Sequence, residues 1–283
     1  MRRDLNNQPL LYVTNSSSVT MYSGLGGSAL TLVGEIFGFQ GPVGECTDAQ
    51  GDVFVADGPA RVVDEYAYGS IVAKNVITDT LGEPYACAID TASGRLAVTN
   101  LTDPSGGEPG NVLVYPSPTR TPVEYSDPQM NEPVFCTFDR KGNLIVDAYD
   151  SSSHPVITEL RKAGTELKTL TLSGLDPRKL YEPSGLEPAG PVMIWGDTGD
   201  VDIDQLKIAG STATLVATLP LSNLYSIGQF ITYGSGSTEV VIIPDYSGSR
   251  LQTYSYPQGT LLFTTTDGIS LPAAAVISHP KAH

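Results

Sequence analysis

Three glutamates recur along the chain at a regular interval, and each stands directly before a proline: Glu83, Glu132 and Glu182. Carboxylates brought together repel one another and gain from a bound cation. Oxygen ligands of this kind suit a divalent ion such as Ca²⁺, which takes six to eight of them. The spacing predicts that the three side chains share one face and form a site for a cation or a cationic ligand. The alternative is a solvated acidic rim.

A second set of polar residues follows short apolar runs at the same interval. An Asp or Asn at such a place is also ordinary turn chemistry, so a structural role is the competing interpretation. Aromatic residues lie in or near the same loops, and convergent polar and aromatic groups are typical of ligand pockets. The candidate ligand-binding residues, beside the three glutamates, are Asp57, Asn100, Asp150, Asp197, Asp245, Tyr85, Tyr149 and Trp195.

The chain has three cysteines, of which Cys87 and Cys136 share a repeat position that Glu45 takes one unit earlier. A zinc site needs about four ligands, and no His falls in register with these three, so packing is the favoured role. An odd count leaves at least one free thiol. We expect no Cys87–Cys136 disulfide, because neighbouring units should hold these residues beyond bridging distance. All three thiols are therefore expected to be free.

Charge and the remaining motifs exclude several classes of function. The net charge of −15 disfavours nucleic acids and anionic membranes and favours cations or cationic partners. No apolar run is long enough to span a membrane. His154, His279 and His283 are scattered, and none forms a recognisable triad with a Ser and an acid.

These candidate residues sit in a repeated unit. "GPVGECTDAQGDVFVAD" (41–57), "GEPYACAIDTASGRLAVTN" (82–100) and "NEPVFCTFDRKGNLIVDAYD" (131–150) share a Pro, an apolar run, an Asp, a Gly and a β-branched run. The Asp and the Gly predict a tight turn between two strands. Third strands end at Tyr22, Tyr66, Tyr115, Leu160, Leu206 and Tyr254, about 46 residues apart.

A four-stranded unit of this length, repeated six times, predicts an all-β, six-bladed β-propeller with antiparallel blades in a single domain. The first unit lacks its innermost strand, and "LPAAAVIS" (271–278) matches the missing segment. We expect this C-terminal strand to pair with the N-terminal blade and close the ring. The expected blades are 9–38 with 271–278, 39–81, 82–130, 131–176, 177–221 and 222–270.

The unit "GPVGECTDAQGDVFVADGPARVVDEY" resembles bacterial NHL-repeat-like propellers, and the likeness covers essentially the whole chain. It implies the fold, while such propellers host many functions. The architecture is also similar to gluconolactonase-like enzymes, which hold an axial metal with Glu, Asn and Asp. Their "EGP" and "PNG" motifs are missing, and "GEP", "NEP" and "YEP" are partial echoes.

The sequence therefore predicts a non-catalytic binding or interaction propeller with an acidic face at the channel mouth. The alternative is a metal-dependent hydrolase or lyase of the gluconolactonase-like type. The expected partner is a small molecule, a cation or a protein, the expected cofactor is none or a divalent ion such as calcium, and the expected state is a monomer. A secreted or periplasmic bacterial location is expected, with a cytoplasmic one as the alternative.

Overall fold

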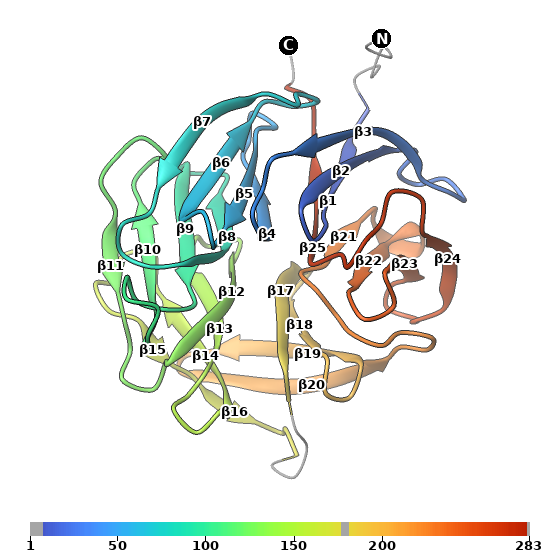
Figure 1. The fold of residues 1–283 in the computed structure, drawn as a ribbon. Helices are drawn as coiled ribbons and strands as arrows, with labels where there is room; N and C mark the ends of the chain where they lie inside the picture. Colours follow the sequence, from blue (N-terminus) through green and yellow to red (C-terminus); the bar gives the residue numbers. More distant parts are fainter. Residues whose placement is uncertain (1–7, 177–180, 282–283) are drawn as a thin grey trace.

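Short strands rich in β-branched residues alternate with tight turns along the chain, and they form six small sheets around one axis (Figure 1). The computed structural model describes residues 8–176 and 181–281. Each sheet is a blade with at least four strands, so the predicted six-bladed β-propeller is confirmed. In the part of the chain that the structure describes, no helix is long and apolar enough to cross a membrane.

The first three blades follow the chain from the N-terminus, except for one strand. Blade 1 contains β25 (Ala274–Ser278), β1 (Leu10–Thr14), β2 (Ser18–Ser23) and β3 (Thr31–Phe37). Blade 2 contains β4 (Pro42–Thr47), β5 (Val53–Asp57), β6 (Val62–Tyr66) and β7 (Ala73–Thr78). Blade 3 contains β8 (Pro84–Asp90), β9 (Arg95–Asn100), β10 (Asn111–Tyr115) and β11 (Val123–Tyr125).

The other three blades complete the ring. Blade 4 contains β12 (Glu132–Phe138), β13 (Leu144–Tyr149), β14 (Pro155–Leu160) and β15 (Lys168–Thr169). Blade 5 contains β17 (Pro183–Ala189), β18 (Val192–Asp197), β19 (Asp202–Ala209), β20 (Thr212–Pro220) and β16 (Thr171–Ser173). Blade 6 contains β21 (Ile231–Tyr233), β22 (Val240–Asp245), β23 (Arg250–Ser255) and β24 (Leu261–Thr265), with a 3₁₀ turn at Gly236–Thr238.

The predicted ring closure is confirmed. Strand β25 pairs antiparallel with β1, from Leu10 opposite Ser278 to Thr14 opposite Ala274. The N- and C-terminal segments thus share one sheet (Figure 1). The inner edge of β1 is therefore paired, because the C-terminal strand β25 covers it.

Blade 5 gains a fifth strand at the expense of blade 4. The segment that follows the third strand of blade 4 is divided between two sheets: the N–H of Leu170 donates to Ile157 in blade 4, and the N–H of Thr171 donates to Ser211 in blade 5. Strand β16 then runs parallel to β20. Strand β20 is nine residues long, and its outer edge would otherwise present unpaired backbone groups.

The core lies between the blades rather than within any one of them. Both faces of each sheet pack on neighbours, and the buried side chains divide into one main cluster for each of the six junctions. The junction of blades 1 and 2, for example, joins Leu10, Tyr12 and Val19 to Val53 and Val55. Burial on both faces explains why the central strands read as continuous apolar runs.

The predicted turn between the first two strands of a blade is also confirmed. Asp48 Oδ1 accepts the N–H groups of Gln50 and Asp52 at 2.8 and 2.9 Å, and Asp139 repeats the pattern. Gly51 and Gly142 have φ angles of 82° and 81°, a region that disfavours residues with a Cβ atom.

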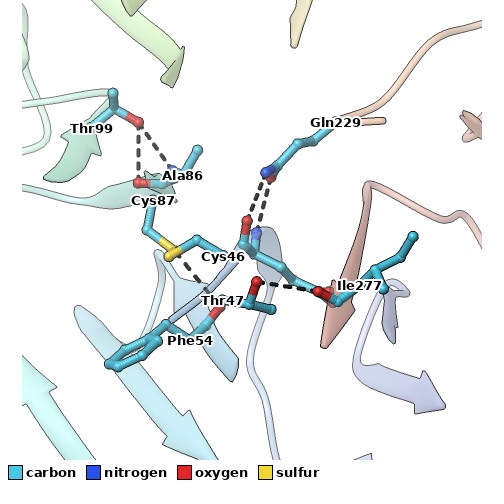
Figure 2. Close-up of a disulfide and its surroundings, with 9 residues drawn as sticks. Cys46, Thr47, Phe54, Ala86, Cys87, Thr99, Gln229 and Ile277 are labelled. Carbon is cyan, nitrogen blue, oxygen red and sulfur yellow. Dashed lines mark hydrogen bonds between the residues drawn. A yellow bond between two sulfur atoms is a disulfide. The ribbon is translucent and has the colours of Figure 1, made fainter. Parts of the chain in front are cut away.

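The prediction of three free thiols is wrong. Cys46 on β4 and Cys87 on β8 form a disulfide with a Cα–Cα distance of 5.6 Å (Figure 2). The inner strands approach closely here, since a Cβ atom on Gly44 would lie 2.5 Å from Ala86 Cα. Cys136 is the buried free cysteine.

The error has a geometric cause. Glu45, Cys87 and Cys136 do occupy the same position in their inner strands. On the neighbouring second strand, the partner of each lies two residues before the partner of Pro42, Pro84 or Pro133. Side chains at this position face the preceding blade. Two such cysteines do not meet. Cys46 is one residue further along β4 and therefore faces the following blade, where it meets Cys87.

Candidate functional site

A cavity of about 470 Å³ opens at the end of the central channel where the inner strands begin. All six blades contribute to it, so it is a property of the closed ring. Its volume lies within the range of small-molecule sites, about 300–1,000 Å³. The lining residues include Ser16, Val43, Tyr85, Phe135, Tyr149, Glu182, Ser184, Thr198, Ile227, Tyr246, Leu271 and Ala273.

β-Bulges in four inner strands shape this end of the channel. The pairing of the first and second strands shifts by one residue just after Pro42, Pro84, Pro133 and Pro183. A bulge re-aims the side chains on its strand, and bulges are common beside functional sites. The side chains of Tyr85 and Phe135, within or beside two of these bulges, line the cavity.

One wall of the cavity is aromatic. The rings of Tyr85 and Phe135 meet edge to face, with centroids 5.5 Å apart and an interplanar angle of 62°. Tyr149 packs against the same small cluster. Tyr246, from blade 6, is 49% exposed and lines the cavity from another side. Of these four residues, Tyr85 and Tyr149 are among the ligand-binding residues predicted from the sequence.

Asp147 fixes the aromatic wall from behind. Its buried carboxylate accepts the N–H of Phe135 at 2.6 Å, which the bulge removes from the ladder, and the indole N–H of Trp195 at 3.2 Å. Burial raises the pKa of Asp147 to about 7, against the effect of these donors. Asp147 is not among the residues predicted from the sequence. An acid inside the apolar run "LIVDAY" was the available signal, because such a group requires partners.

The opposite wall is polar but already hydrogen-bonded. The Ser184 hydroxyl lies 2.7 Å from both the Glu182 carbonyl oxygen and Thr198 Oγ1. Thr198 Oγ1 in turn accepts the N–H of Ile227 at 2.9 Å. These hydroxyl groups join blades 5 and 6 at the rim.

The electrostatic field of the cavity is negative. Burial, helped by Asp147 and Tyr246, raises the pKa of Tyr85 to about 12. Burial and then the Glu182 carboxylate raise the pKa of Tyr149. Among the described residues that line the cavity, none is Lys, Arg or His, and the one carboxylate is Glu182. The cavity therefore offers ring faces, hydroxyl groups and a negative charge.

The structure places the three predicted glutamates in different surroundings. Glu182 lines the cavity. Glu83 accepts a hydrogen bond from Thr102 at 3.3 Å and lies against Gly58. Glu132 interacts with Glu108, and burial and this neighbour raise the pKa of Glu132. Across residues 8–176 and 181–281, no three His, Cys, Asp or Glu side chains are grouped so as to hold a metal.

Three carboxylates of the predicted outer set are buried where second strands end. Asp57 accepts the N–H groups of Gln40 and Gly41 at 2.8 and 2.9 Å, and Asp197 accepts that of Glu182 at 2.9 Å. Asp245 likewise accepts the N–H of Ser226 at 3.1 Å. Each of these carboxylates holds the segment that leads into the inner strand of its own blade. They therefore position the rim of the cavity.

The remaining predicted residues lie away from the cavity. Asn100 is buried and donates to Asn111 at 2.8 Å, while Asp150 accepts the N–H groups of Ser152 and His154 in its own turn. Trp195 is fully buried and stacks on Tyr181 with centroids 5.8 Å apart. None of these three lines the cavity. Their roles as ligand residues remain predictions.

A second cavity, of about 270 Å³, lies among the other ends of the inner strands. It is lined by two glutamates from different blades, Glu45 and Glu187. Burial raises the pKa of each to about 8. Glu45 is 0% exposed, receives a hydrogen bond from Thr14 at one oxygen, and has no partner at Oε2. The side chain of Gln229 reaches the backbone of this residue and donates to the Glu45 carbonyl at 2.6 Å.

The buried Glu45 should make stability depend on pH. Its pKa is 4.5 ordinarily and about 8 in the fold. The native state therefore keeps a proton that the unfolded chain loses, and stability should fall as the pH rises from about 4.5 to about 8. Glu45→Gln should be more stable than the wild type at pH 9 by on the order of 1–3 kcal/mol, because no charge is then buried.

Urea unfolding at pH 5 and pH 9 measures this effect. Glu187→Gln should change stability in the same direction but by less, because Glu187 is only partly buried, whereas Glu166→Gln, whose side chain is 72% exposed, should not change the pH dependence. A gap between Glu45→Gln and the wild type that is equal at both pH values would contradict the assignment.

The fold was compared with known proteins. The sequence matches no protein-family profile and no curated protein sequence. A chain of the nidogen/laminin complex has a TM-score of 0.78 at 14% identity, covering 97% of this chain and 100% of that chain. A Bacteroides caccae protein of unknown function has a TM-score of 0.69 at 12% identity, covering 96% and 99%.

The periplasmic gluconolactonase of Pseudomonas aeruginosa has a TM-score of 0.64 at 13% identity, covering 96% of this chain and 86% of that chain. The resemblance to NHL-like and gluconolactonase-like propellers is therefore confirmed for the fold. At these identities the likeness concerns architecture and does not extend to activity.

Proposed function

We propose that the chain is a non-catalytic binding propeller whose ligand site is the cavity at the channel mouth. The observation that carries this proposal is the cavity itself: about 470 Å³, shared by six blades and walled by four aromatic side chains. Aromatic groups with a few placed polar groups are typical of ligand pockets. The likeness to a chain of the nidogen/laminin complex agrees with a binding role, because that chain takes part in a protein complex.

The geometry favours binding over catalysis. A nucleophile needs a base within hydrogen-bond reach. Among the described lining residues there is no His or Cys, and the Ser184 and Thr198 hydroxyls are engaged with each other and with the backbone. The hydrogen bonds of the two hydroxyls thus run to each other and to the carbonyl groups of Glu182 and Ile227 rather than to a carboxylate.

The alternative is a metal-dependent hydrolase of the gluconolactonase-like type, which rests on the shared fold. Such a site requires several oxygen ligands around one ion. Glu182 is the one carboxylate that the described part of the chain contributes to the cavity wall. The donor set therefore fits a ligand that makes one contact with a carboxylate better than it fits a calcium ion.

Calcium titration separates these alternatives. The binding proposal predicts that the melting temperature stays constant when Ca²⁺ is added, because the described residues group no three carboxylates around one point. A cation site built from Glu83, Glu132 and Glu182 would instead raise it, by about 2.7 kcal/mol of stability at a hundredfold excess over the dissociation constant. Replacing all three residues by Gln would then abolish the rise. A calcium-dependent rise that the triple variant loses would support the metal site.

A blocking variant tests the binding site directly. Val43 is half-buried and lines the cavity, so Val43→Trp should fill part of it. In a ligand-observed NMR screen of mixed small fragments, we expect hits that compete for one site and are lost in Val43→Trp. The matched control is Val76→Trp on the outer strand β7, where Val76 is 50% exposed. Fragment binding that persists in Val43→Trp would overturn the assignment of the cavity.

We also infer that the protein works outside the cytoplasm. The Cys46–Cys87 disulfide supports this, because disulfides form and persist in oxidising compartments and are rare in the cytosol. The acidic composition, with a net charge of −15, is compatible with either location and does not decide between them.

A further inference from the structure

Resting on the proposed function, we propose that the ligand is a small organic cation, an ammonium group on a compact apolar framework. The cavity would hold the ammonium group against the faces of Tyr85 and Tyr149 and beside the Glu182 carboxylate. The framework would pack on Phe135 and Val43. Each of these contacts comes from a residue that lines the same cavity.

The first argument is the chemistry of the wall. Aromatic faces carry negative electrostatic potential and attract cations within about 6 Å of the ring centroid. Phe135 and Tyr85 meet edge to face at 5.5 Å, so their ring planes are inclined by 62° and form a corner rather than a flat stack. Tyr149 packs on the same pair. A corner of rings can surround an alkylammonium group on more than one side.

The second argument is the sign of the surrounding charge. Glu182 lies in the wall and supplies the one carboxylate among the described lining residues. The described lining residues include no Lys, Arg or His that could neutralise this carboxylate or bind an anion. An anionic ligand would meet repulsion here, and a neutral one would leave Glu182 without a partner charge.

The third argument concerns size and approach. A volume of about 470 Å³ admits a small molecule but not a folded protein segment. A net charge of −15 draws cations toward the molecule and raises their association rate. Tyr246, which is 49% exposed, stands at the rim, where an entering ligand passes it.

Three probes with one framework and different charges test the proposal: 2-phenylethylammonium, 2-phenylethanol and phenylacetate. Binding is measured by NMR titration with millimolar probe. We expect the ammonium probe to bind about tenfold more tightly than the alcohol, in line with a cation held by rings and a carboxylate. Phenylacetate should show no binding at the same concentration.

Variants assign the contacts. Glu182→Gln should lower the affinity for the ammonium probe about threefold to fivefold and leave the affinity for the alcohol unchanged, as expected for one partly exposed charge pair. Glu166→Gln, an equivalent change at an exposed position, should affect neither probe. Tyr149→Phe should retain affinity for the cation, and Tyr149→Leu should lose it, because the ring face rather than the hydroxyl makes the contact.

The outcomes separate this inference from the proposed function. If the alcohol or phenylacetate binds as tightly as the ammonium probe, and this binding is lost in the Val43→Trp variant, the cavity is a binding site but the cationic ligand is wrong. If no probe and no fragment depends on Val43, the proposed function fails together with this inference. Loss of the tenfold preference in Glu166→Gln as well would also overturn it, since long-range charge would then account for the selectivity.

Discussion

A chain that ends at Gly268 should be less stable than the full chain by about 5 kcal/mol or more. This truncation removes β25, whose residues Val276 and Ile277 are 5% and 7% exposed and whose alanines are fully buried. Each buried apolar side chain contributes about 1.5–3 kcal/mol. The truncation also uncovers the inner edge of β1 and one side of the disulfide-linked blade 2, where Ser278 donates to Gly51 at 2.5 Å.

Urea unfolding compares this truncation with a chain that ends at Pro280, which retains all of β25 and should be as stable as the full chain. A peptide of residues 269–281 added to the truncated protein should restore part of the lost stability, because it can pair with β1. Equal unfolding midpoints for the truncated and full chains would show that the ring does not depend on this strand.

Removing the disulfide should have the second largest effect. The bond between Cys46 and Cys87 closes a loop with a sequence separation of 41 residues. A loop of this length restricts the unfolded chain by an amount that corresponds to about 4 kcal/mol. Cys46→Ser combined with Cys87→Ser should therefore lower the free energy of unfolding by about 2–4 kcal/mol.

Thiol counting checks the bond itself. Under denaturing, non-reducing conditions the wild type should show one thiol, from Cys136, and reduction should reveal three. Cys136→Ala should show none before reduction and should keep most of the stability. Three thiols in the unreduced wild type would mean that the disulfide does not form.

The sequence could predict the ring because its repeat carries the folding information locally. Asp48 and Asp139 bond to their own turns, and Gly51 and Gly142 supply the backbone angle that those turns need. The closing strand was also predictable, since "LPAAAVIS" fills the place that the first unit leaves empty. Such signals depend on neighbours in the chain rather than on the position of other blades.

Features that depend on contacts between blades were not predictable in the same way. Successive side chains of a strand point to opposite faces, so the side chains that meet across a junction come from different repeat positions. Cys46 and Cys87 therefore pair, although Cys87 and Cys136 share a repeat position. The bulges that turn Tyr85 and Phe135 toward the cavity appear as shifts in strand register, which no single segment displays. The positions of Asp57, Asp197 and Asp245 at strand ends could be predicted from the repeat. Their backbone partners could not, because those N–H groups belong to a segment that only the folded blade brings alongside.

The pairing of β25 with β1 also places both ends of the described chain at the same end of blade 1. Strand β1 begins at Leu10 and β25 ends at Ser278, and these two residues face each other in the sheet. The opposite ends of the same two strands adjoin Ser16 and Ala273, which line the cavity. A tether joined just before Leu10 or just after Ser278 would therefore leave from the side of the ring away from the cavity. Anchored to a surface or fused to a second protein, the propeller would keep its cavity facing outward.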